Sequence, residues 1–445
     1  MREEKQRPWG GDPMIVISLD AVGTEDLPFL KSLPNFGDFW REAAVCERVR
    51  SVYPSLTYPA HTTIVTGKYP ANHGIVNNLQ IQPRREKPDW FWQRRFVRGE
   101  TLYDLVRERG GRTAALLWPV TGKAGIRWNL PEVLPNRPWQ NQITASFFNG
   151  SPLYELRLER KFGHLREGVR QPQLDDFVQA SLLDTLKNCR PDLTLVHFTD
   201  VDSCRHLHGV KSPQAEEALR RHDRRLGEIF SALEALGLKD RANVVILGDH
   251  YQMDVDRAVC LNWYFARAGW LSGRDGRVLA WKVLARECDG SCYVYVRDRR
   301  LIGPVRELLE RLLCRGLASR IYTGREAAAL GADGSCAFMV EGGAGVYYQN
   351  RFDVPEIRAG AQDGAGTRNG SAARNLLQKA THGFYPGRPG YTTIFGGRGP
   401  AFRPGARVET MGLVDEGPTL AAALGMQFSR ADGKIQKNLL FISGN

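Results

Sequence analysis

The chain has 445 residues, a formal net charge of +12 and 42% hydrophobic residues, so it can bury a large core and is not expected to be disordered. It contains no run of about 18 apolar residues, which argues against a membrane span, and its charged first residues lack a signal-peptide core, so we expect a cytoplasmic protein. The positive charge suits a small anionic substrate, whereas the spread of Lys and Arg along the chain does not favour a nucleic-acid polymer as partner.

Four apolar runs indicate buried parallel strands, at residues 14–19, 113–118, 193–198 and 243–247. Helix-like stretches lie between them, at residues 175–187 and 212–236. This alternation predicts an α/β fold with a doubly wound, mostly parallel sheet and helices on both faces. In such sheets, ligands bind at the carboxyl ends of the strands.

The pattern changes after residue 250. Short strand-like pieces at 292–296, 337–340 and 346–348 flank a helix-like stretch at 304–314, and the Gly- and Ala-rich segment 358–374 is expected to be a loop. We therefore predict a smaller α+β cap at 251–380, inserted between two parts of a catalytic core at 14–250 and 381–445. The second part of the core has a predicted strand at 391–395 and a helix at 416–424.

Six side chains that can bind a metal follow predicted strands or the start of the second core segment: Asp20, Asp202, His206, Asp249, His250 and His382. Oxygen and imidazole donors suit zinc, and manganese is also accepted by such a set. Asp202 and His206 are four residues apart, a spacing that places two side chains on the same side of a helical turn. Asp200 and His208 compete with them as candidate ligands.

A seventh candidate is Thr57, which Pro54 and Pro59 flank just before a predicted helix. A threonine hydroxyl is a weak nucleophile unless it is deprotonated, and a metal can hold it as an alkoxide near neutral pH. The alternative is that Thr57 simply caps the helix. Together with the six ligands, Thr57 completes the parts of a two-metal site whose threonine attacks phosphorus.

Several segments carry a resemblance to a known family: ISLD (17–20), PSLTYPAH (54–61), TGKYP (66–70), HGI (73–75), DSCRHLHG (202–209), THG (381–383) and GPAF (399–402). Together they resemble the nucleotide pyrophosphatase/phosphodiesterase family of the alkaline phosphatase superfamily. The resemblance covers residues 14–250 and 380–428. It implies an alkaline phosphatase-like fold and a metal-dependent hydrolase that cleaves phosphodiester or pyrophosphate bonds of nucleotide-type substrates through a threonyl-phosphate intermediate.

The resemblance also implies roles for individual residues. Two divalent ions, expected to be zinc, would be held by two sets of ligands: Asp202, His206 and His382 for one, and Asp20, Asp249, His250 and the oxygen of Thr57 for the other. Asn78 would stabilise the phosphoryl oxygens during the reaction, with Asn77 as the fallback. Tyr58 would stack on the nucleotide base.

Some positions depart from the family pattern. Arg205 and Tyr251 stand where the family often has Gly, and Leu56 and Leu79 stand where members that act on nucleotides often carry Lys. A phosphomonoesterase, a phospholipid-headgroup hydrolase or a phosphonate hydrolase therefore remains open. A sulfatase would need a Cys or Ser in a C/S-x-P-x-R pattern, which does not surround Thr57. The non-enzyme alternative is a ligand-binding protein on the same fold, but such proteins generally lose metal ligands.

Overall fold

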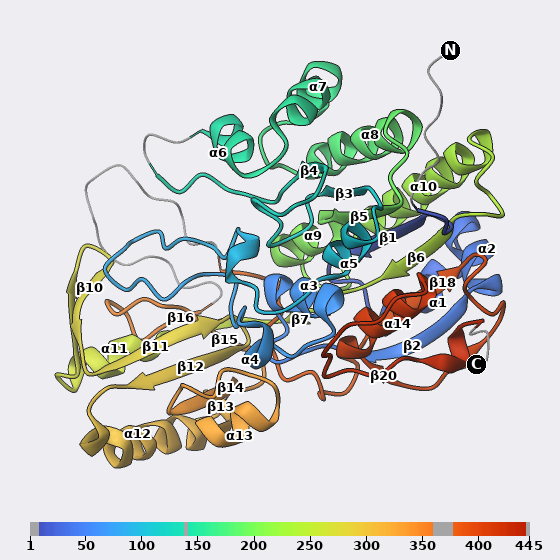
Figure 1. The fold of residues 1–445 in the computed structure, drawn as a ribbon. Helices are drawn as coiled ribbons and strands as arrows, with labels where there is room; N and C mark the ends of the chain where they lie inside the picture. The colour runs from blue at the N-terminus through green and yellow to red at the C-terminus, as the bar shows by residue number, and fades with distance from the viewer. Residues whose placement is uncertain (1–8, 138–140, 359–376, 442–445) are drawn as a thin grey trace.

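The structure is a computed structural model that describes residues 9–137, 141–358 and 377–441 (Figure 1). Its largest sheet has nine strands in the order β19-β2-β18-β6-β1-β5-β3-β4, with β20 beside β2. The strands are β1 (Met14–Leu19), β2 (Ala44–Arg50), β3 (Thr113–Leu116), β4 (Trp128–Leu130), β5 (Leu193–Phe198), β6 (Asn243–Leu247), β18 (Thr393–Arg398), β19 (Arg407–Val408) and β20 (Met411–Gly412). Only β18 runs antiparallel to its neighbours, so the predicted mostly parallel α/β sheet is confirmed.

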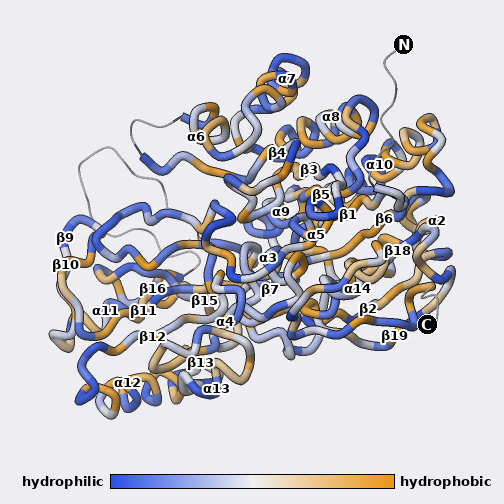
Figure 2. The backbone as a smooth tube through the Cα atoms, viewed as in Figure 1, coloured by the Kyte–Doolittle hydropathy of each residue, from blue (hydrophilic) through white to orange (hydrophobic). Residues whose placement is uncertain are grey.

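Three of the four predicted strands have the expected bounds, and the fourth is shorter. The run at 113–118 ends as a strand at Leu116 because Leu117 adopts a left-handed backbone with φ of 52°, which breaks the extended conformation. Side chains of β1 alternate between the two faces of the sheet: Ile15 and Ile17 enter one core, and Met14 and Val16 enter the other. A strand buried on both faces is therefore mostly apolar, as the orange tube at β6 shows in Figure 2.

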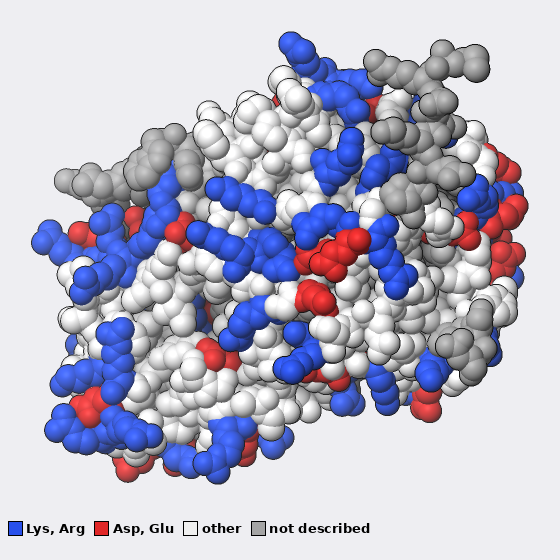
Figure 3. All heavy atoms as spheres, in the orientation of Figure 1, with Lys and Arg blue, Asp and Glu red and all other residues white. Residues whose placement is uncertain are grey.

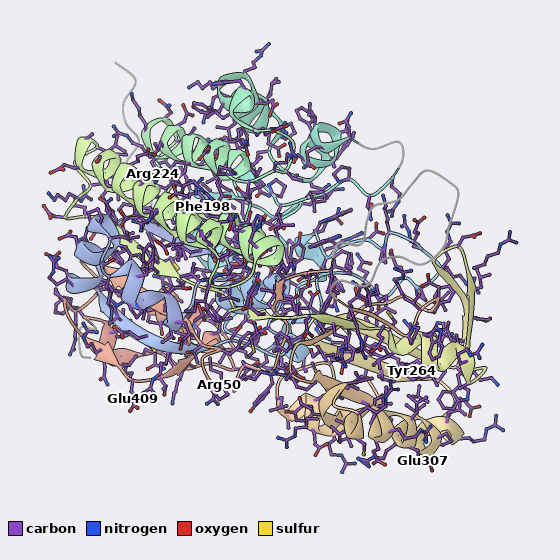
Figure 4. All side chains as sticks on the ribbon, turned by 180° about the vertical axis from the view of Figure 1, so that it is seen from behind. Arg50, Phe198, Arg224, Tyr264, Glu307 and Glu409 are labelled. Carbon is purple, nitrogen blue, oxygen red and sulfur yellow. The ribbon has the colours of Figure 1, made fainter. Side chains whose placement is uncertain are left out.

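Helices cover both faces of this sheet. One face packs against α2 (Pro34–Glu42), α7 (Pro152–Phe162), α8 (Gln173–Asn188) and α10 (Pro213–Ala235). In Figure 4, α10 crosses the back of the molecule, where it buries Leu219 and Leu226 in the same core as Phe198 of β5. The other face packs against α3 (Thr57–Thr66), α5 (Leu102–Glu108) and α14 (Glu416–Ala423). Within the described ranges, no helix is long and apolar enough to cross a bilayer.

Residues 251–358 form smaller sheets beside the main one. A four-stranded antiparallel sheet has the order β11 (Val283–Cys288), β12 (Ser291–Val296), β14 (Phe338–Gly342) and β13 (Ala318–Thr323). Its core includes side chains of α11 (Leu261–Arg267) and α12 (Ile302–Cys314). A three-stranded sheet is formed by β8 (Arg257–Val259), β15 (Val346–Tyr348) and β16 (Glu356–Arg358), and β9 (Leu271–Arg274) and β10 (Arg277–Trp281) form a hairpin. The division of the chain at residues 250 and 380 stays a prediction, and the expected loop at 358–374 lies outside the described residues beyond Arg358.

Candidate metal centre and its cavity

The candidate ligands meet at the carboxyl edge of the central sheet because β1 lies between β5 and β6. Asp20 directly follows β1, and Asp249 with His250 follows β6. The helix α9 (Asp200–His208) begins just after β5 and carries Asp202 and His206 on consecutive turns. A short antiparallel pair, β7 (Met253–Asp254) and β17 (Ala380–Thr381), brings His382 back to the same edge. The structure thus brings all six predicted ligands together.

The donor atoms form two adjacent groups. Around Nε2 of His250 lie Oγ1 of Thr57 at 3.2 Å, Oδ2 of Asp249 at 3.2 Å and Oδ1 of Asp20 at 3.4 Å. A second group places Oδ1 of Asp202 3.3 Å from Nε2 of His206 and 3.9 Å from Nε2 of His382. The rings of His250 and His382 stack with centroids 4.0 Å apart, so the two groups adjoin. Donor atoms of Asp20, Asp202 and His250 also lie within 4.8 Å of one another, which places Asp202 within reach of both groups.

The charges and free donor atoms of this cluster fit divalent cations. Oδ1 of Asp20 and Oδ2 of Asp249 are buried and accept no hydrogen bond from the described residues. Burial, followed by repulsion from Asp202, raises the pKa of Asp20 to about 7, and burial raises the pKa of Asp249 well above its usual value. Buried carboxylates without a counter-charge are costly, and a cation relieves that cost. The oxygen and imidazole donors are those that zinc prefers.

A second layer of side chains orients the ligands. Nδ1 of His206 lies 2.9 Å from the carbonyl oxygen of Ala380, so Nδ1 carries the proton and Nε2 is free to bind a cation. His197 of β5 places Nε2 3.1 Å from Oδ2 of Asp20. We did not predict a role for His197, although a histidine inside an otherwise apolar strand is the sequence signal that could have revealed it.

Thr57 is the first residue of α3, and Leu56 is the N-cap. The hydroxyl of Thr57 does not cap the helix; it lies beside His250, at the positive end of the helix dipole, where an anion is favoured. The preceding loop is tied to the His382 segment, because the N–H of Gly383 donates to the carbonyl of Ser55 at 2.9 Å. Gly383 has φ of 82°, and a Cβ there would lie 1.8 Å from the Cys288 carbonyl, so this close approach requires glycine.

The two asparagines after α3 are distinguished by their hydrogen bonds. Oδ1 of Asn78 accepts from the backbone N–H of Tyr58 at 2.9 Å, which leaves its Nδ2 donors for a ligand in the cavity that Asn78 lines. Nδ2 of Asn77 donates to the carbonyl of Glu287 at 2.7 Å, and its Oδ1 accepts from Leu79 at 2.9 Å. The geometry therefore favours Asn78 over Asn77.

The structure does not bring the Tyr58 ring to the cavity, as the predicted stacking role would require. Tyr58 is fully buried, its hydroxyl donates to the carbonyl of Glu132 at 3.2 Å, and its ring meets Trp90 edge-on at 5.2 Å. Trp90 is one of the aromatic residues that line the cavity, together with Phe147 and Phe177.

Arg205 and Tyr251, the two residues that stand where the family often has Gly, contact each other. The guanidinium of Arg205 lies 4.9 Å from the centre of the Tyr251 ring and forms an ion pair with Asp26 at 2.5 Å. It also donates to the carbonyl of Ala21, in the turn that follows Asp20. All of these side chains are buried, so the pair fixes α9 against the turn after β1.

Replacing Arg205 with Met should lower the free energy of unfolding by about 3–5 kcal/mol, because the buried carboxylate of Asp26 loses its cation. Urea unfolding checks this value. The matched control is Arg41→Met, which breaks an exposed ion pair with Asp38 and should cost less than about 1 kcal/mol. Equal effects of the two substitutions would contradict a structural role for Arg205.

A cavity of about 460 Å³ opens over the candidate metal centre. One end is formed by the residues just described: Asp20, Thr57, Asn78, Asp202, His206 and His382. The other end is formed by the segment from Leu130 to Phe177, which includes α6 (Gln142–Asn149) and α7. Figure 1 shows these two helices outside the sheet, at the top of the view.

Glu155 of α7 lines this cavity, and burial raises its pKa from 4.5 to about 8. Between these two values, the folded protein keeps a proton that the unfolded chain releases, so Glu155 makes the protein less stable as pH rises. Glu155→Gln should therefore raise the melting temperature at pH 9 more than at pH 5. Glu216→Gln, at an exposed site on α10, should show no such pH dependence. A pH-independent effect at Glu155 would contradict the raised pKa.

Comparisons with known proteins place the chain in a family. Residues 14–330 match the sequence model of the type I phosphodiesterase / nucleotide pyrophosphatase family. The chain is 26% identical over 270 residues to ectonucleotide pyrophosphatase/phosphodiesterase family member 1 of Rattus norvegicus, covering 57% of this chain and 25% of the relative. It is also 26% identical over 267 residues to a venom phosphodiesterase of Macrovipera lebetinus, covering 57% of this chain and 27% of the relative.

A solved structure shares the fold. Murine ectonucleotide pyrophosphatase / phosphodiesterase 5, as an inactive variant in complex with AMP, superposes with a TM-score of 0.67 at 17% identity, covering 97% of this chain and 100% of that one. The match to the curated relatives spans about a quarter of their length. The family match over most of the chain supports one conclusion. The chain belongs to the type I phosphodiesterase / nucleotide pyrophosphatase family.

Proposed function

We propose that this protein is a hydrolase that cleaves a phosphodiester or pyrophosphate bond with two divalent metal ions, expected to be zinc. The observation that carries the proposal is the position of the Thr57 hydroxyl. It lies at the start of α3, 3.2 Å from Nε2 of His250, and lines the cavity together with Asp202 and His382. A hydroxyl among metal ligands at a helix N-terminus is suited to attack phosphorus.

The two adjacent groups of donor atoms would each hold one ion. Asp202, His206 and His382 would hold one, and Asp20, Asp249, His250 and Thr57 would hold the other. When bound, the ions would neutralise charge on the phosphoryl group and lower the pKa of the attacking hydroxyl. Family membership supports the same chemistry, since the names of the relatives describe phosphodiesterases and nucleotide pyrophosphatases.

The reaction would run in two displacements. In the first, Oγ1 of Thr57 forms a bond to phosphorus while the bond from phosphorus to the leaving oxygen breaks, which gives a threonyl-phosphate. In the second, water forms a bond to phosphorus and the bond to Thr57 breaks, which regenerates the hydroxyl. Nδ2 of Asn78 would donate to a phosphoryl oxygen as charge develops on it, since Oδ1 is already engaged by the Tyr58 N–H.

A comparison of ester types tests this function. The metal-replete protein should hydrolyse a bis-nitrophenyl phosphodiester faster than nitrophenyl phosphate, and a chelator should abolish both activities. Zinc or manganese, added back separately, would then identify the ion that restores the rate. Faster hydrolysis of the monoester would assign the protein to the phosphomonoesterases, and metal binding without turnover would favour the ligand-binding alternative.

A further inference from the structure

Glu341 is a buried carboxylate in the four-stranded sheet beside the main one. Charged side chains are spread over the visible face of the molecule in Figure 3, as expected for groups that water solvates. Glu341 instead lies in β14 and is only 3% exposed. A carboxylate in such a place is costly unless hydrogen bonds and a positive charge compensate it. The groups that compensate Glu341 therefore indicate what it holds together.

The partners of Glu341 come from the two chain segments that carry Thr57 and His382. Its Oε2 accepts a hydrogen bond of 2.8 Å from the hydroxyl of Tyr53, which lies four residues before Thr57. Its Oε1 and Oε2 lie 3.0 and 3.1 Å from the backbone nitrogen of Tyr385, three residues after His382. One carboxylate of the smaller sheets thus holds both segments.

Arg388 supplies the positive charge for this arrangement. Its Nε donates to Oε1 of Glu341 at 2.6 Å, and its Nη2 donates to the carbonyl of Gly342 at 2.5 Å. Hydrogen bonds between charged groups are shorter and stronger than neutral ones. Because Arg388 follows Tyr385 in the same segment, the ion pair and the backbone bond both fix the His382 segment against β14.

Apolar packing joins the Thr57 segment to the same sheet. Leu56, directly before Thr57, and Tyr53 belong to one buried cluster with Tyr293 of β12 and Met339 of β14. The cluster leaves little room for the segment to move on its own, because protein interiors are closely packed. A change at Glu341 would therefore be transmitted to Thr57.

Resting on the function proposed above, we propose that Glu341 is a positioning residue for the two-metal site. It sets the separation of the Thr57 and His382 segments, and through them the distance between the two groups of metal ligands. Glu341 is not among the described residues that line the cavity, so it acts through these segments and not on the substrate. It also lies beyond residues 14–330, which match the family model. The smaller sheets thereby take part in the activity without supplying a ligand.

Tyr53→Phe tests the proposal, because it removes one hydroxyl and with it the bond from the Thr57 segment to Glu341. The matched control is Tyr295→Phe. The hydroxyl of Tyr295 donates to Asp333, also at 2.8 Å, and both residues lie within 251–358, which carries none of the candidate ligands. We expect Tyr53→Phe to weaken zinc binding by about tenfold, as loss of an outer-layer partner does, and Tyr295→Phe to leave it unchanged. Competition with a chromophoric chelator measures this affinity without turnover.

Kinetics of the zinc-loaded protein give a second measurement. Tyr53→Phe should lower kcat for a nitrophenyl phosphodiester by about tenfold or more at an unchanged KM, because a displaced nucleophile slows the chemical step. Glu341→Gln keeps the size of the side chain but offers one acceptor oxygen in place of two, so it should weaken zinc binding more than Tyr53→Phe does. Should Glu341→Gln fail to fold, Tyr53→Phe and its control still decide the question.

The outcomes separate the positioning role from the proposed function. If Tyr53→Phe lowers the urea midpoint but leaves zinc affinity and kcat unchanged, Glu341 has a structural role only and the proposal fails. Equal losses of zinc affinity in Tyr53→Phe and Tyr295→Phe would also overturn it. If no phosphodiester is cleaved, yet Tyr53→Phe weakens zinc binding and Tyr295→Phe does not, the proposed function fails and the positioning role stands. If diesters are cleaved and Tyr53→Phe binds zinc as the wild type does, the function stands and the positioning role fails.

Discussion

Thr57→Ala should lower kcat/KM for a nitrophenyl phosphodiester by at least about a thousandfold, because it removes the hydroxyl that is proposed to form the bond to phosphorus in the first displacement. Thr57 is only 8% exposed, and the substitution removes no more than its hydroxyl and one methyl group, so the fold should be retained. The metal content should stay close to that of the wild type, because the carboxylates and imidazoles of the cluster remain. Steady-state kinetics and metal analysis of the same preparation check both statements.

Thr57→Ser is the matched control for this prediction. It keeps the hydroxyl at the start of α3 and should retain far more activity than Thr57→Ala, although loss of the methyl group loosens the side chain. If Ala and Ser variants were equally active, the hydroxyl would not be the nucleophile. If both lost their metal, the loss of activity would report on the metal centre instead.

The parallel strands of the core could be predicted from sequence because burial on both faces makes them continuous apolar runs. The strand β2 could not, because it lies near the edge of the sheet and carries Glu47, Arg48 and Arg50 among its apolar residues. The run that forms β5 was predicted as a strand, but His197 within it contacts Asp20 and acts in the second layer of the site. Apolarity alone therefore locates a strand and misses a polar residue that the strand contributes to its carboxyl edge.

The candidate ligands could be found because each follows a strand, whereas the shape of the cavity could not. The cavity depends on how α6 and α7 pack over the end of β4. This packing joins segments that are far apart from the metal ligands in sequence, so no local sequence pattern predicts it. The choice between Asn77 and Asn78 likewise depends on backbone direction, which places one amide against Glu287 and the other in the cavity. Tyr58 illustrates the same limit, since adjacency to Thr57 in sequence does not give its ring a place beside the substrate.

The two histidines of α9 allow a test of His206 as a proposed metal ligand, with His208 as its neighbour on the same helix. His206→Ala should remove about one of two bound ions and lower kcat/KM by more than the roughly 10–100-fold that loss of an outer-layer partner costs. The reason is that Nε2 of His206 faces Asp202 at 3.3 Å, while Nδ1 is held by the Ala380 carbonyl. His208→Ala is the control, because His208 is exposed on the same helix and its loss should change neither metal content nor rate.

Equal loss of metal from both variants would mean that α9 as a whole, and not the His206 imidazole, is needed. Retention of two ions in His206→Ala would remove His206 from the ligand set, and Asp202 with His382 would then have to bind their ion without it.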